Sequence, residues 1–132
     1  METIRKINDE LAIAGQILPE QLKQLAEQGF KSVLNLRSPD EQGFSSNEQQ
    51  QAESFGLCYA NVPAQMESID GESATFVLQY INELPKPELV HCENGALAAV
   101  MVLMHIAIRQ GDTVNQAFER VEQLGLFKKY GR

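Results

Sequence analysis

Hydrophobic and polar positions along the chain follow two periods, one typical of strands and one typical of helices. Short apolar runs bounded by turn residues predict strands, and apolar residues at helical spacing predict the segments between them to be helices. The expected strands are 4–7, 11–14, 32–36, 57–62 and 88–91. The expected helices, delimited also by proline, glycine and capping-box signals, are 19–28, 47–55, 72–84, 96–108 and 113–123.

The order of these elements predicts the fold class. Strands that alternate with helices form a parallel or mostly parallel central sheet flanked by helices. We expect residues 1–132 to form a single α/β domain, because this length suits one hydrophobic core. Parallel sheets place ligand sites at the carboxyl ends of their strands. If the strands are parallel neighbours, the ends at Leu36-Arg37 and His91-Cys92 lie on the same edge.

Composition and charge exclude several classes of function. The apolar fraction of 43% and the charged fraction of 22% are ordinary for a globular protein, and two cysteines are too few for a disulfide framework. With no stretch resembling a secretory signal, we expect a cytoplasmic protein. The longest apolar run, 96–108, is shorter than the roughly 20 residues needed to cross a bilayer. The net charge of −7 disfavours nucleic acid and anionic membranes as partners.

A cysteine stands between the last strand and the apolar helix. At such a turn, free backbone amides and the positive helix end converge, which binds an oxyanion and favours a nucleophilic thiolate at Cys92. Gly95 allows the turn, and His91 is expected to fix the loop from below by hydrogen bonding. The alternative is a buried cysteine that merely ends a core strand. The predicted anion-binding residues are Glu93, Asn94, Gly95, Ala96, Leu97 and Ala98.

The segment ELVHCENGALAAVMVLMHIA resembles the signature of cysteine-dependent phosphatases, and more closely that of short bacterial phosphatase-like domains related to the dual-specificity phosphatases. The segments LAIAGQILPEQLKQLAEQGFKSVLNLRSPDE and AESFGLCYANVP are similar to the opening segment and the middle strand of that family. The resemblance implies the protein-tyrosine-phosphatase fold. It also implies hydrolysis of a phosphorylated small molecule or phosphoprotein through attack by Cys92, without a cofactor.

The loop lacks the arginine of that family. Such loops place it five or six residues after the cysteine, where this chain has Leu97 and Ala98. Two lost charge-assisted bonds remove about 3–6 kcal/mol of binding or transition-state stabilisation. That loss lowers the rate by a factor on the order of 10² to 10⁴, and Glu93 adds further negative charge. The sequence therefore predicts a weakly active or inactive phosphatase-like protein with an oxyanion-binding or regulatory role.

Two further residues have one functional and one structural interpretation. Arg37 is expected to border the pocket, where it either replaces the missing cation or pairs with Asp40 or Glu41. The general acid of a phosphatase-type reaction is predicted to be Asp70, whose alternative role is to cap the helix that follows. Glu67 and Asp40 are weaker candidates for the acid.

Three other functions remain open. The first is an active tyrosine or dual-specificity phosphatase that uses Arg37 as its cation, and the second is a rhodanese-like sulfurtransferase that carries a persulfide on Cys92. The third is a non-catalytic interaction domain. Cys58 and His105 are predicted to pack in the core, and no metal site is expected, because adjacent His91 and Cys92 do not have a chelating spacing.

Overall fold

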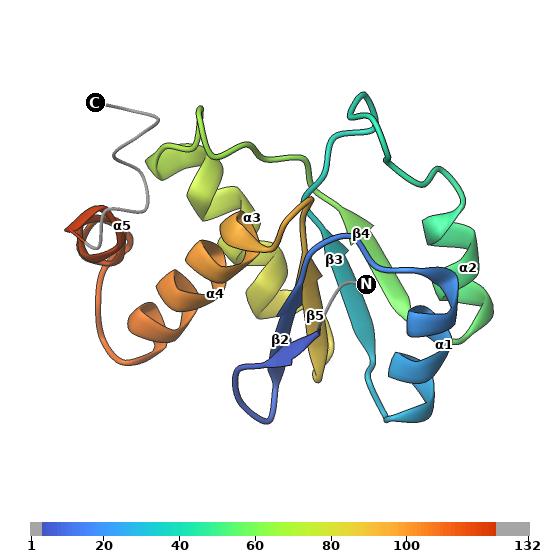
Figure 1. Cartoon of the computed structure of the whole chain (residues 1–132). Helices are drawn as coiled ribbons and strands as arrows, with labels where there is room; N and C mark the ends of the chain where they lie inside the picture. Colours follow the sequence, from blue (N-terminus) through green and yellow to red (C-terminus); the bar gives the residue numbers. More distant parts are fainter. Residues whose placement is uncertain (1–3, 124–132) are drawn as a thin grey trace.

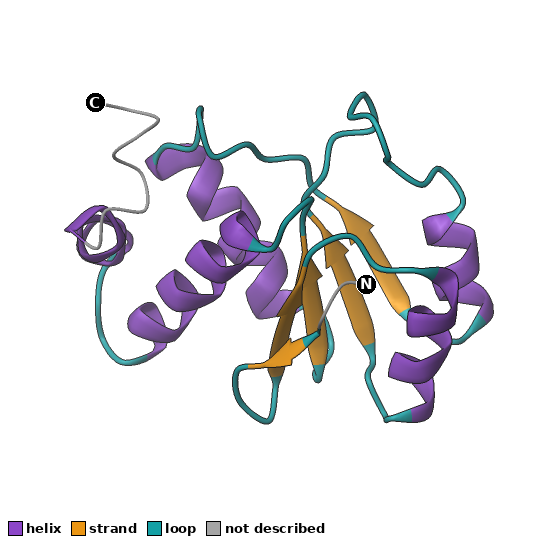
Figure 2. Cartoon of the chain, viewed as in Figure 1, coloured by secondary structure: helices purple, strands orange, loops and turns teal. Residues whose placement is uncertain are grey.

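The computed structural model describes residues 4–123, which form a central five-stranded sheet with helices on both faces (Figures 1 and 2). The strand order is β1-β2-β5-β3-β4, and every pair is parallel except the antiparallel edge pair β1 and β2. The predicted α/β fold with a mostly parallel sheet is confirmed. The strands are β1 (Arg5–Lys6), β2 (Leu11–Ala14), β3 (Ser32–Asn35), β4 (Cys58–Asn61) and β5 (Glu88–His91).

Helices α1 and α2 cover one face of the sheet, and α3, α4 and α5 lie on the other (Figure 1). Each begins and ends within a few residues of its predicted bounds. None of the helices between residues 4 and 123 is long and apolar enough to span a bilayer. The helices are α1 (Pro19–Glu27), α2 (Glu48–Ser54), α3 (Gly71–Glu83), α4 (Ala96–Arg109) and α5 (Val114–Gln123).

Alternating side chains of the central strands divide the interior into two hydrophobic clusters. In β3, Val33 joins the cluster under α1 and α2, and Leu34 joins the cluster under α3, α4 and α5. Leu89 and Val90 of β5 divide in the same way. Successive side chains of a strand point to opposite faces, so a central strand covered on both sides is buried on both faces. This explains why the strand signal in the sequence is a pair of adjacent apolar residues rather than an alternation of apolar and polar ones.

The apolar helix α4 is the central helix of its layer. It packs against α3, α5 and the sheet, and His105 is buried within it, as predicted. Helix α5 begins with the predicted capping box: the Thr113 amide donates to Gln116 Oε1 at 2.8 Å, and the Gln116 amide donates to Thr113 Oγ1 at 3.1 Å. The start of α5 is therefore fixed by local hydrogen bonds.

The register of the sheet brings three strand ends together. His91 of β5 pairs with Ala14 of β2 on one side and with Asn35 of β3 on the other. The segments that follow these three strands therefore leave the same edge of the sheet, as expected for parallel neighbours.

One core prediction is wrong. Cys58 was expected to be a core residue but is exposed, because it opens the edge strand β4 rather than lying in its middle. An edge strand has a neighbour on one side only, and the residues of β4 are exposed or half-buried.

Candidate active site

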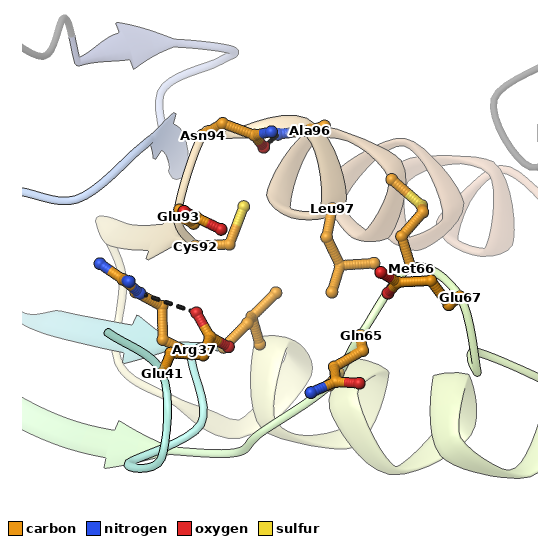
Figure 3. Close-up of a pocket in the computed structure, with 12 residues that line it drawn as sticks. Arg37, Glu41, Gln65, Met66, Glu67, Cys92, Glu93, Asn94, Ala96 and Leu97 are labelled. Atoms are coloured by element: carbon orange, nitrogen blue, oxygen red, sulfur yellow. Dashed lines mark hydrogen bonds and ion pairs between the residues drawn. The ribbon is translucent and has the colours of Figure 1, made fainter. Parts of the chain in front are cut away.

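Cys92 lies directly after β5, in the turn that leads into α4 (Figure 3). Its backbone amide donates to the carbonyl of Ala14 at 3.2 Å, so the turn is fastened to the end of β2. The Gly95 amide donates to Cys92 Sγ at 3.1 Å. Cys92 is 6% exposed. The sulfur is therefore held inside the turn by a backbone donor.

The turn requires glycine at position 95. Gly95 has a φ of 87° and is the N-cap of α4. Only glycine adopts this left-handed conformation without steric cost. The Ala96 amide donates to the side chain of Asn94 at 3.0 Å, and the Ala99 amide donates to the Gly95 carbonyl at 3.0 Å. The amides of Leu97 and Ala98 belong to the first helical turn, which has no carbonyl four residues earlier inside the helix.

A cavity of about 280 Å³ opens beside the thiol. It lies between the Cys92 turn, the segment after β3 and the segment between β4 and α3, and Figure 3 shows Arg37 and Glu41 on one side of it and Met66 and Glu67 on the other. The structure thus brings several predicted site residues to one hollow. The lining residues are Leu36, Arg37, Glu41, Ala64, Gln65, Met66, Glu67, Cys92, Glu93, Asn94, Ala96 and Leu97.

Of the two positions where the family has its arginine, only one lines the cavity. Leu97 lines the cavity, whereas Ala98 is 0% exposed and belongs to the core cluster beneath α3, α4 and α5. Gly95 and His91 are also absent from the lining. Of the residues predicted to bind the anion, Arg37, Glu93, Asn94, Ala96 and Leu97 line the cavity, and Gly95 and Ala98 do not.

Asp70 does not reach the cavity. It is exposed and is the N-cap of α3, where its Oδ1 accepts from the Ser73 amide and from the Ser73 hydroxyl, each at 2.9 Å. The bond from the Ser73 amide, followed by that from its hydroxyl, lowers the pKa of Asp70. A carboxyl group that loses its proton more readily and lies outside the cavity is poorly suited to be a general acid. The structure favours the capping role, and Glu67 of the same segment lies in the lining.

Arg37 is buried, with 3% exposure, and the carboxylate of Glu41 accepts from its Nε at 3.0 Å. The Gln16 side chain accepts from Nη1 at 2.9 Å, and the Gln42 carbonyl accepts from Nη2 at 2.7 Å. A longer contact joins Nη1 to the Gly43 carbonyl at 3.4 Å. The pairing with Glu41, one of the two alternatives for Arg37, is the one present, and it opposes the role of substitute cation.

A buried polar network behind the thiol was not predicted from the sequence. His91 Nε2 lies 2.5 Å from Glu48 Oε2, and both residues are almost fully buried. Gln16 donates to Glu48 Oε1 at 2.9 Å and through its backbone amide to the Glu93 carbonyl at 3.2 Å. His91 was expected to fix the loop, and its observed partner is Glu48 of α2. The one sequence signal that could have placed Gln16 near the site is its position shortly after the end of β2. No local sequence feature indicates that Glu48 belongs to this network.

The charges around the cavity are mostly negative. Arg37 is the one cation among the lining residues described, and three glutamates, Glu41, Glu67 and Glu93, share that lining. Glu41 pairs with Arg37, and in the described part of the chain neither Glu67 nor Glu93 forms an ion pair. The cavity therefore combines a thiol with an excess of carboxylates.

Comparison with known proteins identifies relatives of this site and fold. The family model for the phosphatase-like domain of beta-lactamase hydrolase-like protein matches residues 3–101. A beta-lactamase hydrolase-like protein of Agrobacterium fabrum is 30% identical over 111 residues, which are 82% of this chain and 26% of the relative. The chain thus spans about a quarter of the length of the curated relatives it matches.

Two crystal structures illustrate the shared fold. A phosphatase candidate from Shewanella putrefaciens CN-32 is 17% identical with a TM-score of 0.75, covering 98% of this chain and 91% of that one. The core catalytic domain of the PP-IP phosphatase SIW14 from S. cerevisiae is 19% identical with a TM-score of 0.68, covering 98% of this chain and 78% of that one. The predicted resemblance to cysteine-dependent phosphatases is confirmed at the level of family and fold.

Proposed function

Because the chain belongs to the family of phosphatase-like domains of beta-lactamase hydrolase-like proteins, we propose that its cavity binds oxyanions beside Cys92 and hydrolyses phosphate esters weakly or not at all. The observation that carries this proposal is the combination of the cavity, the thiol held by the Gly95 amide, and the uncharged Leu97 and Ala98 at the two candidate positions of the arginine. The phosphate group of a small molecule or of a phosphoprotein is the ligand class.

The residues present supply one part of the chemistry of phosphoryl transfer. The Cys92 sulfur would attack phosphorus while the alkoxide or phenoxide leaves, and water would later release phosphate from the thiophosphate. Loop amides hold oxygens in the ground state and in the transition state alike. What the loop lacks is a forked cation for the charge that develops on the equatorial oxygens. Binding is therefore retained more fully than turnover.

An aryl-phosphate assay tests this proposal, with tungstate binding measured by calorimetry as a separate readout. We expect the wild type to bind tungstate. We also expect it to turn over aryl phosphate on the order of 10² to 10⁴ times more slowly than a variant in which an arginine has been restored to the loop. Leu97→Arg and Ala98→Arg restore a cation at the two candidate positions, and Cys92→Ser is the inactive control. Turnover by the wild type at the rate of the restored variants would disprove the proposal.

A second candidate is a sulfurtransferase that carries a persulfide on Cys92. The specific observation in its favour is that the one cation among the described lining residues, Arg37, is paired with Glu41, while the Gly95 amide donates to the sulfur. A persulfide sulfur carries a single negative charge and needs amide donors but no phosphate fork. The thiolate would attack the sulfane sulfur of thiosulfate, the S–S bond would break, and sulfite would leave with the electron pair.

Mass spectrometry separates the two candidates. After incubation with thiosulfate, or with a low-molecular-weight persulfide of lower charge, the sulfurtransferase hypothesis expects one additional sulfur atom on Cys92, removable by cyanide or by an acceptor thiol. Cys58 provides an internal control, because it is an exposed cysteine on the edge strand. Modification of Cys58 alone, or of neither cysteine, would exclude the sulfurtransferase.

A further inference from the structure

The guanidinium of Arg37 is occupied on all three of its nitrogens. Two of the acceptors are neutral carbonyl oxygens of Gln16 and Gln42, at 2.9 and 2.7 Å, and the third is the Glu41 carboxylate at 3.0 Å from Nε. Arg37 is the one cation among the described residues that line the cavity, and Glu41 is the one carboxylate among them that contacts it. The charge of Arg37 is compensated before any ligand enters.

Glu41 is itself held in place from the opposite side. Its Oε2 accepts from the Ser38 amide at 2.8 Å, while its Oε1 accepts from Arg37 Nε. Both oxygens of the carboxylate are therefore fixed by the turn that follows β3. Its side chain is 24% exposed and faces the cavity (Figure 3). The carboxylate therefore lies at the cavity wall in direct contact with the Arg37 guanidinium.

We propose that Glu41 is a specificity-determining residue: by compensating Arg37 at the cavity wall, it weakens the binding of dianionic groups relative to oxyanions with a single negative charge. Phosphate diesters, sulfonates and carboxylates belong to this class. The inference rests on the proposed function, since it assumes that the loop amides bind an oxyanion. Glu67 and Glu93 add to the repulsion of a dianion, but neither touches the cation.

Two tetrahedral oxyanions of nearly equal size test the charge directly: tungstate carries two negative charges and perrhenate carries one. In the wild-type protein, we expect perrhenate to bind more tightly than tungstate. Glu41→Gln removes the compensating charge and keeps an acceptor for the Ser38 amide. We expect it to raise tungstate affinity about tenfold and perrhenate affinity about threefold, because the energy of a charge interaction is proportional to the charge of the ligand.

Matched variants separate this effect from a general loss of negative charge. Glu67→Gln removes a carboxylate of the same lining that makes no ion pair among the described residues, and we expect a smaller gain from it. Glu41→Ser provides a second substitution at the same position, and thermal unfolding confirms that each variant is folded. An equal gain in Glu67→Gln, or equal gains for the two ions in Glu41→Gln, would overturn the proposal.

The outcome for the restored-arginine variants distinguishes this inference from the proposed function. If Leu97→Arg or Ala98→Arg binds tungstate while neither Glu41 variant gains affinity, the specificity role of Glu41 is wrong and the oxyanion site stands. If no variant binds either ion, the oxyanion site itself is wrong, and the inference is overturned with it.

Discussion

The buried carboxyl group of Glu88 allows a direct test of how burial affects the pH dependence of the free energy of unfolding. Glu88 is the first residue of β5 and is 0% exposed, and neither carboxyl oxygen accepts a hydrogen bond. The Lys86 ammonium lies 3.3 Å from Oε1 but donates to the carbonyls of Ile81 and Leu84 at 2.7 and 2.6 Å. Burial outweighs the attraction of Lys86 and raises the pKa of Glu88 to about 8. The protonated, neutral form is therefore favoured in the folded state.

The sign and size of the effect on stability follow from this shift. The folded pKa of about 8 lies above the unfolded value of 4.5, so the folded state binds the proton more tightly. The corresponding stability is fully present below pH 4.5 and is lost as the pH rises through 8. Between pH 5 and pH 9, the loss is roughly 4 kcal/mol, because each pKa unit corresponds to about 1.4 kcal/mol. Glu88→Gln keeps the shape of the side chain and removes this titration.

Urea unfolding followed by circular dichroism measures the difference between Glu88→Gln and the wild type at the two pH values. All other titrating groups contribute to both proteins and cancel in that difference. We expect the free energy of unfolding of Glu88→Gln to increase relative to wild type by roughly 4 kcal/mol on going from pH 5 to pH 9. The exposed Glu83→Gln is the control and should show a much smaller change. A difference that is the same at both pH values would refute the argument.

Three further substitutions test the site. Glu48→Ala leaves the buried His91 without its partner and should lower the free energy of unfolding by about 3 kcal/mol in urea, whereas Glu48→Gln should cost less. Gly95→Ala forces a φ of 87° on alanine; we expect a loss of about 1 kcal/mol in urea and weaker tungstate binding by calorimetry. Asp70→Ala removes the cap of α3 and should lower the melting temperature slightly in a thermal scan, without changing any Cys92-dependent turnover of aryl phosphate.

The elements of the fold could be predicted because each has a local signature. Two adjacent apolar residues, Leu89 and Val90, mark the doubly covered strand β5, and the threonine and glutamine of the α5 capping box lie three residues apart. The Cys92 turn has the same advantage, since strand, thiol, glycine and helix follow one another directly in the chain. Boundaries fixed by adjacent residues are visible in a sequence without any knowledge of tertiary contacts.

The polar network could not be predicted, because its partners are distant in the sequence. Glu48 is 43 residues from His91 and 32 from Gln16, and only the packing of α2 beside the sheet brings them together. The position of Asp70 outside the cavity lining could not be predicted for a different reason. Its segment contains two acidic residues three positions apart, and spacing alone does not say which faces the cavity; the serine three residues after Asp70 was the readable sign of a cap.

Under the proposed function, the fold is retained without efficient turnover because of charge rather than backbone geometry. The positive φ of Gly95, the register of β5 and the amides at the start of α4 are backbone features that a neutral loop retains. Turnover of a dianion depends in addition on a cation, and a cation at the cavity wall is effective only while no carboxylate compensates it. The Arg37–Glu41 contact removes that condition. An arginine restored to the loop and the removal of the carboxylate at position 41 should both increase the uncompensated positive charge at the cavity. We therefore expect their effects on dianion affinity to be less than additive, because residues that share one ligand are coupled.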